Sequence, residues 1–312
     1  MYRLGIDLGG TNIVAGIVDE NYNIVFKKSV KTNVGRSAAE IVNSIANLMF
    51  DTIDGAGISL SEIVSFGIGS PGVVDSVNGI IKRAGNLGFN ELNLTYFLKK
   101  ATEKDFYIEN DANAATYGEF IAGAGVGTKN FIVITLGTGI GSGIIINDKL
   151  FAGCEIGHIT IDINGEICSD CGNIGCFENY ASATALISQT KKAMLLEKNT
   201  IMWDIAKTLD NVSGRTVFDA AKMGDQTALK LIDKYVGYLS AGIMTAIRMF
   251  EPQKICIGGG ISNEKDYLIR PIIEYINKHN KSGNLLKTTE ISIAKLQNDA
   301  GIIGAAFLDK LK

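Results

Sequence analysis

The sequence predicts an α/β fold built from two similar halves. Two stretches share one pattern, a strand, a glycine-rich turn and a second strand ending in a polar turn: IDLGGTNIVAGIVDE at 6–20 and ITLGTGIGSGIIIND at 134–148. Stretches with apolar residues at helical spacing, such as 227–250, accompany them. Strands with glycine turns, combined with such helices, indicate a duplicated α/β unit that holds phosphate between its halves.

The composition is that of a globular protein. With 312 residues, 46% hydrophobic and 20% charged, the chain is long enough for two domains. The net charge of −3 comes from scattered residues of both signs, which argues against a nucleic-acid surface. No apolar run approaches the ~18 residues of a membrane span, and no signal peptide precedes the first strand-like residues. We therefore expect a cytoplasmic protein with reduced cysteines.

The first glycine turn follows a predicted strand at 2–7 and is followed by more strand-like sequence. A dinucleotide fingerprint needs a helix after its glycines, so this pattern excludes that motif. Converging N–H groups in such a hairpin turn can bind phosphate, although a plain turn explains the glycines as well. Asp7, at the strand end, is well placed to hold Mg²⁺ through water. The candidate phosphate-binding residues are Gly9, Gly10, Thr11 and Asn12.

Ser37 and Glu40 form a capping box that predicts a helix to about residue 54. A strand is expected at 63–68, and residues 80–94 are expected to form a loop. A short strand at 106–110 ends at Asn110, and a helix follows. Asp111 then lies at a helix N-terminus, where the macrodipole stabilises its charged form. Helix capping is the common role of an Asp at such a position.

The second glycine turn contains Gly137, Thr138 and Gly139. Thr138 is a candidate to bind phosphate through its hydroxyl, or it simply ends a strand. Residues 179–247 are expected to be mainly helical. The rest of the chain predicts a strand at 254–257, a glycine loop at 258–260, a helix at 266–279, a strand at 290–294 and a final helix to residue 312 capped by Asn298-Asp299.

A cysteine-rich loop is the most specific feature of the sequence. Cys168, Cys171 and Cys176 fall within nine residues, and His158 lies ten residues before the first of them. Three thiolates and one imidazole make a complete tetrahedral set for zinc. Ordinary burial is the alternative and suits Cys154 and Cys256, but it fits poorly where cysteines lie among Asp, Asn, Ser and Gly.

This loop carries a family resemblance. Glu155-x-Gly157-His158, followed by Cys-x-x-Cys-Gly-x-x-Gly-Cys-x-Glu, resembles the signature of the ROK family of sugar kinases and sugar-responsive repressors. The usual pattern has one residue between the first two cysteines, whereas this chain has Ser169 and Asp170. The resemblance implies a two-domain actin-like ATPase (ribonuclease H-like) fold, with a nucleotide and sugar cleft between the domains and a structural zinc.

The resemblance also implies an activity, an ATP-dependent hexose kinase that phosphorylates the 6-hydroxyl. Asp111 is then the catalytic base. In this family the zinc-binding histidine also contacts the sugar, and Gly259 and Gly260 lie close to the nucleoside. The implied cofactors are ATP, Mg²⁺ and Zn²⁺. The implied sugar-binding residues are Asn86, Asn110, Asp111, Glu155, His158 and Glu178. A loop Asn such as Asn86 is otherwise commonly a turn former.

Glucose is the expected substrate. The alternatives are N-acetylmannosamine, N-acetylglucosamine, allose or fructose, or a sugar sensor without catalysis. Only six residues precede Asp7, so we expect no N-terminal DNA-binding domain of the kind that ROK repressors carry. The resemblance further implies a homodimer or homotetramer. The expected domains are a small one, residues 1–115 plus 299–312, and a large one, residues 116–298.

Overall fold

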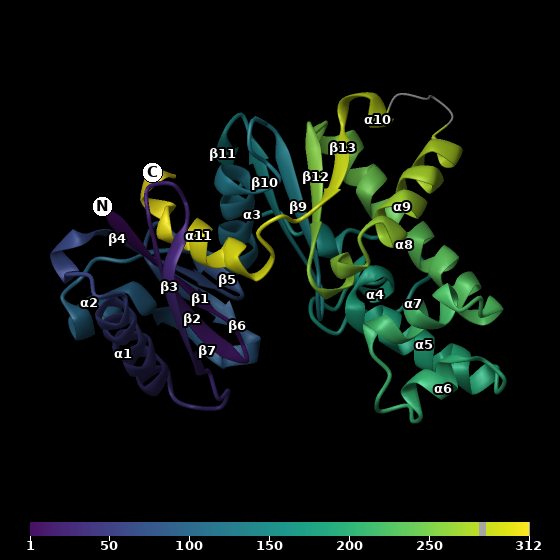
Figure 1. Cartoon of the computed structure of the whole chain (residues 1–312), viewed down its shortest axis with the longest axis horizontal. Coiled ribbons are helices and arrows are strands. Elements are labelled where there is room, and N and C mark those ends of the chain that lie inside the picture. The colour runs from purple at the N-terminus through teal and green to yellow at the C-terminus, as the bar shows by residue number, and fades with distance from the viewer. Residues whose placement is uncertain (281–284, 312) are drawn as a thin grey trace. The chain divides into compact units, whose positions relative to one another are not determined.

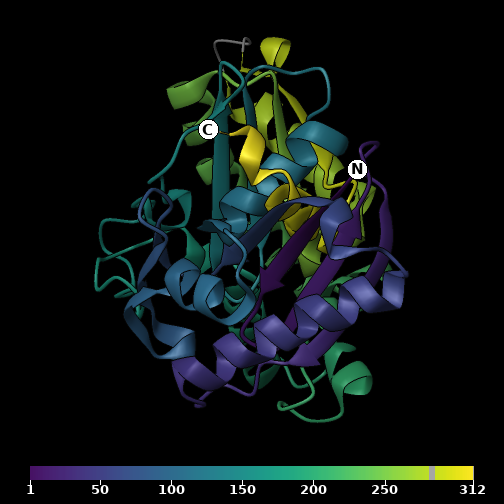
Figure 2. The same cartoon turned by 90° about the vertical axis from the view of Figure 1, so that its left-hand side faces the viewer.

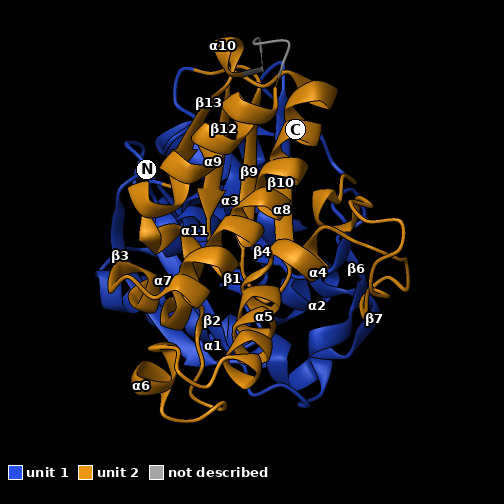
Figure 3. Cartoon of the chain, turned by 90° about the vertical axis from the view of Figure 1, so that its right-hand side faces the viewer, with its two compact units in different colours: residues 1–127, 143–152, 295–312 blue, residues 128–142, 153–294 orange. Residues whose placement is uncertain are grey.

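The computed structural model describes residues 1–280 and 285–311 (Figure 1). Residues 281–284 of the predicted large domain, and Lys312 at the end of the predicted last helix, lie outside the described residues. The chain forms two compact units (Figure 3). Unit 1 contains Met1–Gly127, Gly143–Ala152 and Lys295–Lys312, and unit 2 contains Thr128–Ser142 and Gly153–Ala294.

Unit 1 is organised around a five-stranded sheet with the order β3-β2-β1-β4-β8. Strands β1 (Tyr2–Leu8), β2 (Asn12–Val18) and β3 (Ile24–Lys31) form an antiparallel meander. Strands β4 (Ile63–Ser70) and β8 (Tyr107–Asn110) continue the sheet parallel to β1. The carboxyl ends of β1, β4 and β8 therefore meet at one edge, where loop residues can form a site.

Helices cover both faces of this sheet. Figure 2 shows α1 (Ala38–Ala56) running across one face, where it packs on β2 and β3 beside α2 (Leu94–Thr102). The predicted Ser37 capping box is present and begins α1. Helix α11 (Ala300–Ala306) packs on strands β1 and β4 and also against α3 (Asp111–Ala122).

Two glycines allow α11 to lie directly on the strands. A side chain at Gly5 would collide with the carbonyl of Ile302, and one at Gly67 would collide with the carbonyl of Ala305. The close approach brings Gly301 against the end of β1, where a Cβ on it would lie 3.1 Å from Asp7 Oδ2. The C-terminal helix is thus part of the wall around Asp7.

Residues 73–93 contain a small three-stranded sheet, so the loop predicted at 80–94 is wrong. Strands β5 (Val73–Asp75), β6 (Ile80–Ala84) and β7 (Phe89–Asn93) pair in antiparallel order β5-β6-β7. Ile81 and Phe89 are buried in the unit 1 core. Gly85 and Asn86 lie in a short 3₁₀ helix, η2 (Gly85–Leu87), whereas Asn90 and Asn93 lie in β7.

The second five-stranded sheet repeats the order of the first, β11-β10-β9-β12-β13. Strands β9 (Phe131–Leu136) and β10 (Ile140–Ile146) carry the second glycine turn, and β11 (Lys149–Leu150) pairs antiparallel with β10. Strands β12 (Lys254–Gly258) and β13 (Glu290–Ile293) follow in parallel. The repeated order agrees with the duplication read from the sequence.

Helices dominate residues 178–288, as predicted for 179–247. They are α4 (Glu178–Ala181), α5 (Ala183–Leu196), α6 (Met202–Ala206), α7 (Gly214–Lys222), α8 (Gln226–Phe250), α9 (Asp266–His279) and α10 (Leu285–Thr288). The remaining 3₁₀ helices are η1 (Leu60–Glu62), η3 (Ile156–His158), η4 (Gly260–Glu264), η5 (Gln297–Asp299) and η6 (Leu308–Lys310). No described helix combines the length and apolar character needed to cross a bilayer.

The end of the chain departs from prediction in two ways. The last α-helix stops at Ala306, and η6 follows it. Asp299 precedes α11 but makes no capping hydrogen bond. Its carboxylate instead accepts from Lys27 Nζ at 2.7 Å, an ion pair with β3 that the local sequence does not reveal.

Candidate active site and metal centre

Two carboxylates meet at the carboxyl edge of the unit 1 sheet. Asp7 pairs with Gly69 in β4, and a Cβ on Gly69 would lie 3.5 Å from Asp111 Cα. Burial raises the pKa of Asp7 to about 6, and the negative charge of Asp111 adds to this effect. Burial also raises the pKa of Asp111, so desolvation outweighs the stabilisation expected from the helix N-terminus.

Asn110, and not Asp111, caps helix α3. Asn110 Oδ1 accepts from the backbone N–H of Asn113 at 3.1 Å, and its Nδ2 donates to the Gly72 carbonyl at 3.0 Å. The capping role considered for Asp111 is therefore wrong. Asp111 is the first helical residue, and its Oδ1 accepts from the Ala112 N–H at 2.8 Å. Within the described chain its donors are the backbone N–H groups of Ala112 and of Asp111 itself, so no side chain occupies the carboxylate and it can take a substrate proton.

The first glycine turn is closed by backbone hydrogen bonds. The Gly9 N–H donates to the Asn12 carbonyl at 3.0 Å, and the Thr32 hydroxyl donates to the Gly9 carbonyl at 2.6 Å. Asn86 lies beside this turn, since a Cβ on Gly10 would be 3.3 Å from Asn86 Nδ2. The structure thus brings Asn86 to the same part of unit 1 as the predicted phosphate-binding residues.

The second glycine turn is held from two sides within unit 2. The Gly137 N–H donates to the Gly139 carbonyl at 3.0 Å, and the Ala183 N–H at the start of α5 donates to the Gly137 carbonyl at 2.9 Å. Glu178 Oε2 accepts from the Ile140 N–H at 3.3 Å. Glu178 Oε1 accepts from Cys168 Sγ at 3.2 Å, so one carboxylate contacts both the glycine turn and the cysteine-rich loop.

The glycine loop after β12 approaches the second turn. Gly259 adopts a φ of +83°, and a side chain there would collide with the backbone of Leu136 at the end of β9. Gly260 opens η4, where the Ser262 hydroxyl donates to the Gly259 carbonyl at 2.7 Å. Only glycine allows this backbone contact, so the predicted nucleoside-binding loop lies next to the predicted phosphate-binding turn.

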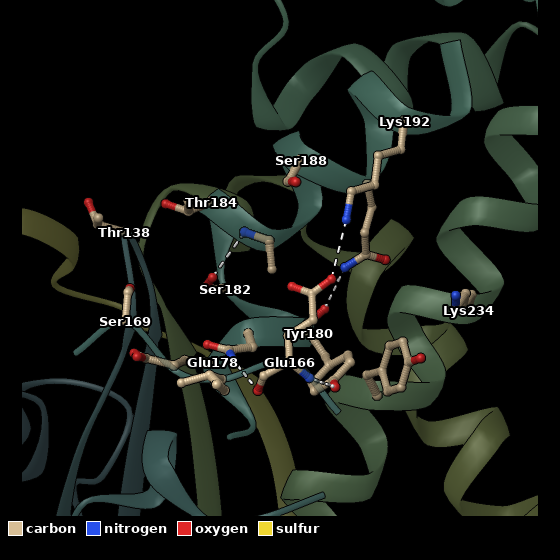
Figure 4. Close-up of a pocket in the computed structure, with 15 residues that line it drawn as sticks. Thr138, Glu166, Ser169, Glu178, Tyr180, Ser182, Thr184, Ser188, Lys192 and Lys234 are labelled. Carbon is tan, nitrogen blue, oxygen red and sulfur yellow. Dashed lines mark hydrogen bonds and ion pairs between the residues drawn. The ribbon is translucent and has the colours of Figure 1, made fainter. Parts of the chain in front are cut away.

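A cavity of about 460 Å³ opens within unit 2 beside Thr138 and Glu178 (Figure 4). The cysteine-rich loop, α4, α5 and α8 supply its other walls. Lys192 Nζ reaches Glu166 Oε1 across it at 3.3 Å. Its lining is mostly polar: Thr138, Glu166, Ile167, Ser169, Glu178, Asn179, Tyr180, Ser182, Thr184, Ala185, Ser188, Gln189, Lys192, Lys234 and Tyr238.

The four predicted metal ligands converge. Sγ of Cys168, Cys171 and Cys176 and a ring nitrogen of His158 all lie within 4.8 Å of one another. The Sγ atoms of Cys171 and Cys176 are 3.4 Å apart, and Cys168 Sγ is 3.8 Å from His158 Nδ1. Tetrahedral zinc with bonds of ~2.3 Å places its sulfur ligands ~3.8 Å apart, so this cluster fits zinc.

Asp170, one of the two residues between Cys168 and Cys171, contacts His158. His158 Nε2 lies 3.3 Å from Asp170 Oδ2, while Nδ1 faces Cys168 and Glu178 Oε1, the latter at 3.8 Å. Sequence reasoning noted the longer Cys-x-x-Cys spacing but missed this contact. A carboxylate on the second ring nitrogen fixes the imidazole orientation.

The other residues of this region lie outside the ligand cluster. Glu155 is exposed and precedes η3, where its carbonyl accepts from the His158 N–H at 3.1 Å. Cys256 is fully buried in β12, and Cys154 is half-buried. Neither cysteine belongs to the cluster of four.

The two sheets, with glycine turns at their hairpins and acidic residues at strand ends, define a two-domain actin-like ATPase fold of the sugar kinase type. The chain belongs to the ROK family, whose sequence model matches residues 3–311.

Relatives match the chain over nearly its whole length. It is 34% identical to a glucokinase of Thermotoga maritima, covering 98% of this chain and 96% of the relative. It is 35% identical to a glucokinase of Streptomyces coelicolor, with the same coverage. A ROK glucokinase from Streptomyces griseus, crystallised with glucose and AMPPNP, superposes with a TM-score of 0.84 at 32% identity, covering 99% of both chains.

Proposed function

We propose that this chain is an ATP-dependent hexose kinase that transfers the γ-phosphate of ATP to the 6-hydroxyl of glucose. The observation that carries the proposal is the Asp111 carboxylate, which is partly buried, does not cap helix α3 and lies close to Asp7. The similarity to two glucokinases, and to a glucokinase bound to glucose and AMPPNP, supports glucose and ATP as the substrates.

Asp111 acts as the general base. The oxygen of the sugar hydroxyl forms a bond to the γ-phosphorus, the bond to the β-phosphate oxygen breaks, and Asp111 takes the hydroxyl proton. Burial raises the pKa of Asp111, which makes its carboxylate a stronger base than an exposed one. The rest of the catalysis is positioning and charge stabilisation, as phosphoryl transfer requires.

The glycine turns hold the nucleotide. Gly9, Gly10, Thr11 and Asn12 of the first turn and Gly137, Thr138 and Gly139 of the second bind phosphate, and Gly259 and Gly260 lie near the nucleoside. Asp7 holds Mg²⁺ through water because its carboxylate lies beside the first turn. When bound, Mg²⁺ neutralises charge on the β- and γ-phosphates.

The proposed sugar-binding residues are Asn86, Asn110, Glu155, His158 and Glu178. His158 would contact the sugar by exchanging the Nε2 contact with Asp170 for a sugar hydroxyl. Carboxylates accept hydrogen bonds from ring hydroxyls, and a site built this way disfavours sugars that leave these groups unpaired. His158, Cys168, Cys171 and Cys176 hold a structural zinc, because four protein ligands leave no open position for chemistry.

We also propose the domain division, assembly and location expected from the sequence. The small domain contains residues 1–115 and 299–312, and the large domain contains residues 116–298. The contacts of α11 with the unit 1 sheet support assigning the last helix to the small domain. The protein is cytoplasmic and forms a homodimer or homotetramer.

A coupled ADP-release assay tests the function. Purified protein with Mg-ATP is offered glucose, fructose, allose, N-acetylglucosamine and N-acetylmannosamine, and its zinc content is measured. We expect the highest kcat/KM with glucose and about one zinc per chain. A clear preference for an N-acetylhexosamine would show that this sugar, and not glucose, is the substrate. If folded, zinc-containing protein released no ADP in response to any sugar, the proposed kinase activity would be wrong and a sugar sensor would be favoured.

A further inference from the structure

Glu109 is a buried carboxylate that the proposed mechanism does not use. It lies in β8 two residues before Asp111, with only 8% of its surface exposed. Within the described chain no Lys or Arg pairs with it. A buried ionised carboxylate without a cation needs several hydrogen bonds to remain charged, so its partners matter.

Three hydrogen-bond donors converge on Glu109. Oε1 accepts from the backbone N–H of Asn110 and from Asn113 Nδ2, both at 2.9 Å. Oε2 accepts from the Ser76 hydroxyl at 2.7 Å. Two of these donors belong to the turn that begins α3, and the third belongs to the turn between β5 and β6.

The turn that begins α3 also contacts the residue that precedes β5. Asn110 Nδ2 donates to the Gly72 carbonyl at 3.0 Å, while Asn110 Oδ1 caps α3. Glu109 and Asn110 thus tie the β5–β6 region to the turn that carries Asp111. Loss of Glu109 would leave a backbone N–H, a side-chain amide and a hydroxyl without their acceptor.

We propose that Glu109 is a positioning residue for phosphoryl transfer. It fixes the Asn110–Asp111 turn and holds the Ser76 turn against it, so that the proposed base and Asn110, a proposed sugar-binding residue, keep one geometry. This inference rests on the proposed role of Asp111. Its chemical basis is that a displacement of ~1 Å at a reacting group can cost ~100-fold in rate.

Two substitutions of Glu109 separate geometry from charge. In Glu109→Gln, the amide oxygen still accepts both N–H groups, and the amide nitrogen donates to the Ser76 hydroxyl, which can accept. We expect kcat to stay within about threefold of wild type. In Glu109→Leu, all three donors lose their acceptor, and we expect kcat to fall about 30-fold or more and the glucose KM to rise. AMPPNP affinity should change less than about twofold, which shows that the chain is folded.

Glu119 supplies the matched control. This Glu is also buried, and its carboxylate accepts from the backbone N–H groups of Ala124, Lys295 and Leu296. It lies in the same helix but ten residues further along the chain than Glu109. Glu119→Leu loses the same number of hydrogen bonds, so we expect a lower thermal midpoint but a kcat within about twofold of wild type per folded molecule.

Ser76→Ala is a milder test if either Leu variant fails to fold. It removes one contact, and we expect kcat/KM for glucose to fall about three- to tenfold, with AMPPNP affinity unchanged. Wild-type kinetics in Ser76→Ala, or in folded Glu109→Leu, would overturn the inference, as would equal losses in Glu109→Leu and Glu119→Leu. Glucose-dependent turnover that survives Asp111→Asn would refute the base assignment instead, so the two failures are distinguishable.

Discussion

Replacing Asp7 by Asn is expected to stabilise the ligand-free protein at neutral pH and to abolish its activity. Asp7 carries a charge at the buried end of β1, and Asp111 lies close enough to oppose that charge. Asn keeps the shape of the side chain and removes the charge. It also removes the carboxylate that we propose as the Mg²⁺ partner, so stability and activity change in opposite directions.

The pKa of Asp7 gives the size and direction of the effect. Folding raises it from 3.8 to about 6. Below the pKa of Asp7 in the unfolded state, Asp7 is protonated in both states and no charge is buried. As the pH rises from there through the pKa in the folded state, Asp7 ionises more readily in the unfolded state, so the native state loses stability. Raising the pKa by ~2 lowers the free energy of unfolding by about 3 kcal/mol at pH 7.5. This value is an upper bound for the gain from Asp7→Asn, because burying the Asn amide also costs free energy.

Urea unfolding of both proteins at pH 4.0 and pH 7.5, without Mg²⁺ or ATP, measures the effect. We expect Asp7→Asn to gain about 1–3 kcal/mol over wild type at pH 7.5 and much less at pH 4.0. Asp51→Asn is the control, since Asp51 is exposed and pairs with Lys28 at the surface. An equal difference at both pH values, or no gain at pH 7.5, would refute the electrostatic reasoning.

Three other substitutions test separate features. Cys176→Ser should reduce zinc well below one per chain and lower the thermal midpoint; full zinc occupancy by elemental analysis would contradict the ligand set. Ser37→Ala should cost about 1 kcal/mol in urea unfolding and leave kcat unchanged, and no measurable cost would contradict the observed capping box. Gly67→Ala should cost about 1–3 kcal/mol by forcing α11 away from β4, and wild-type stability would rule out their close contact.

Local signals predicted much of the fold. The capping box at Ser37 fixed the start of α1, and helix α9 begins and ends where its apolar spacing predicts. The two glycine hairpins indicated the duplication because strand–turn–strand patterns are local in sequence. The convergence of His158 with three cysteines was predictable for a related reason, since the three cysteines lie within nine residues.

Contacts distant in the sequence were not predictable. Residues 73–93 contain a small sheet because Ile81 and Phe89 reach the core, whereas the polar turns between them suggested a loop. Asp299 pairs with Lys27 on β3 and so does not cap α11. The contact between Asp170 and His158 depends on how the loop folds back, which the spacing of its cysteines does not specify.

The candidate site was also predictable only where its signals are local in the sequence. Its motifs named Asp7 and Asp111, but their shared burial and raised pKa depend on the register of β1, β4 and β8. The sequence also left open whether Asp111 caps a helix, and the structure gives that role to Asn110. Glu109 carried no distinctive signal, because its partner Ser76 lies far from it in the chain.

The kinetic effect of Asp111→Asn tests the central claim most directly. Wild-type and variant protein, matched for zinc content and AMPPNP affinity, are compared for glucose-dependent ADP release at saturating ATP and glucose. The account predicts that the variant loses about 10²–10⁴-fold in kcat, the range expected when a general base is removed. A variant with near-wild-type kcat would contradict the assignment of Asp111 as the base.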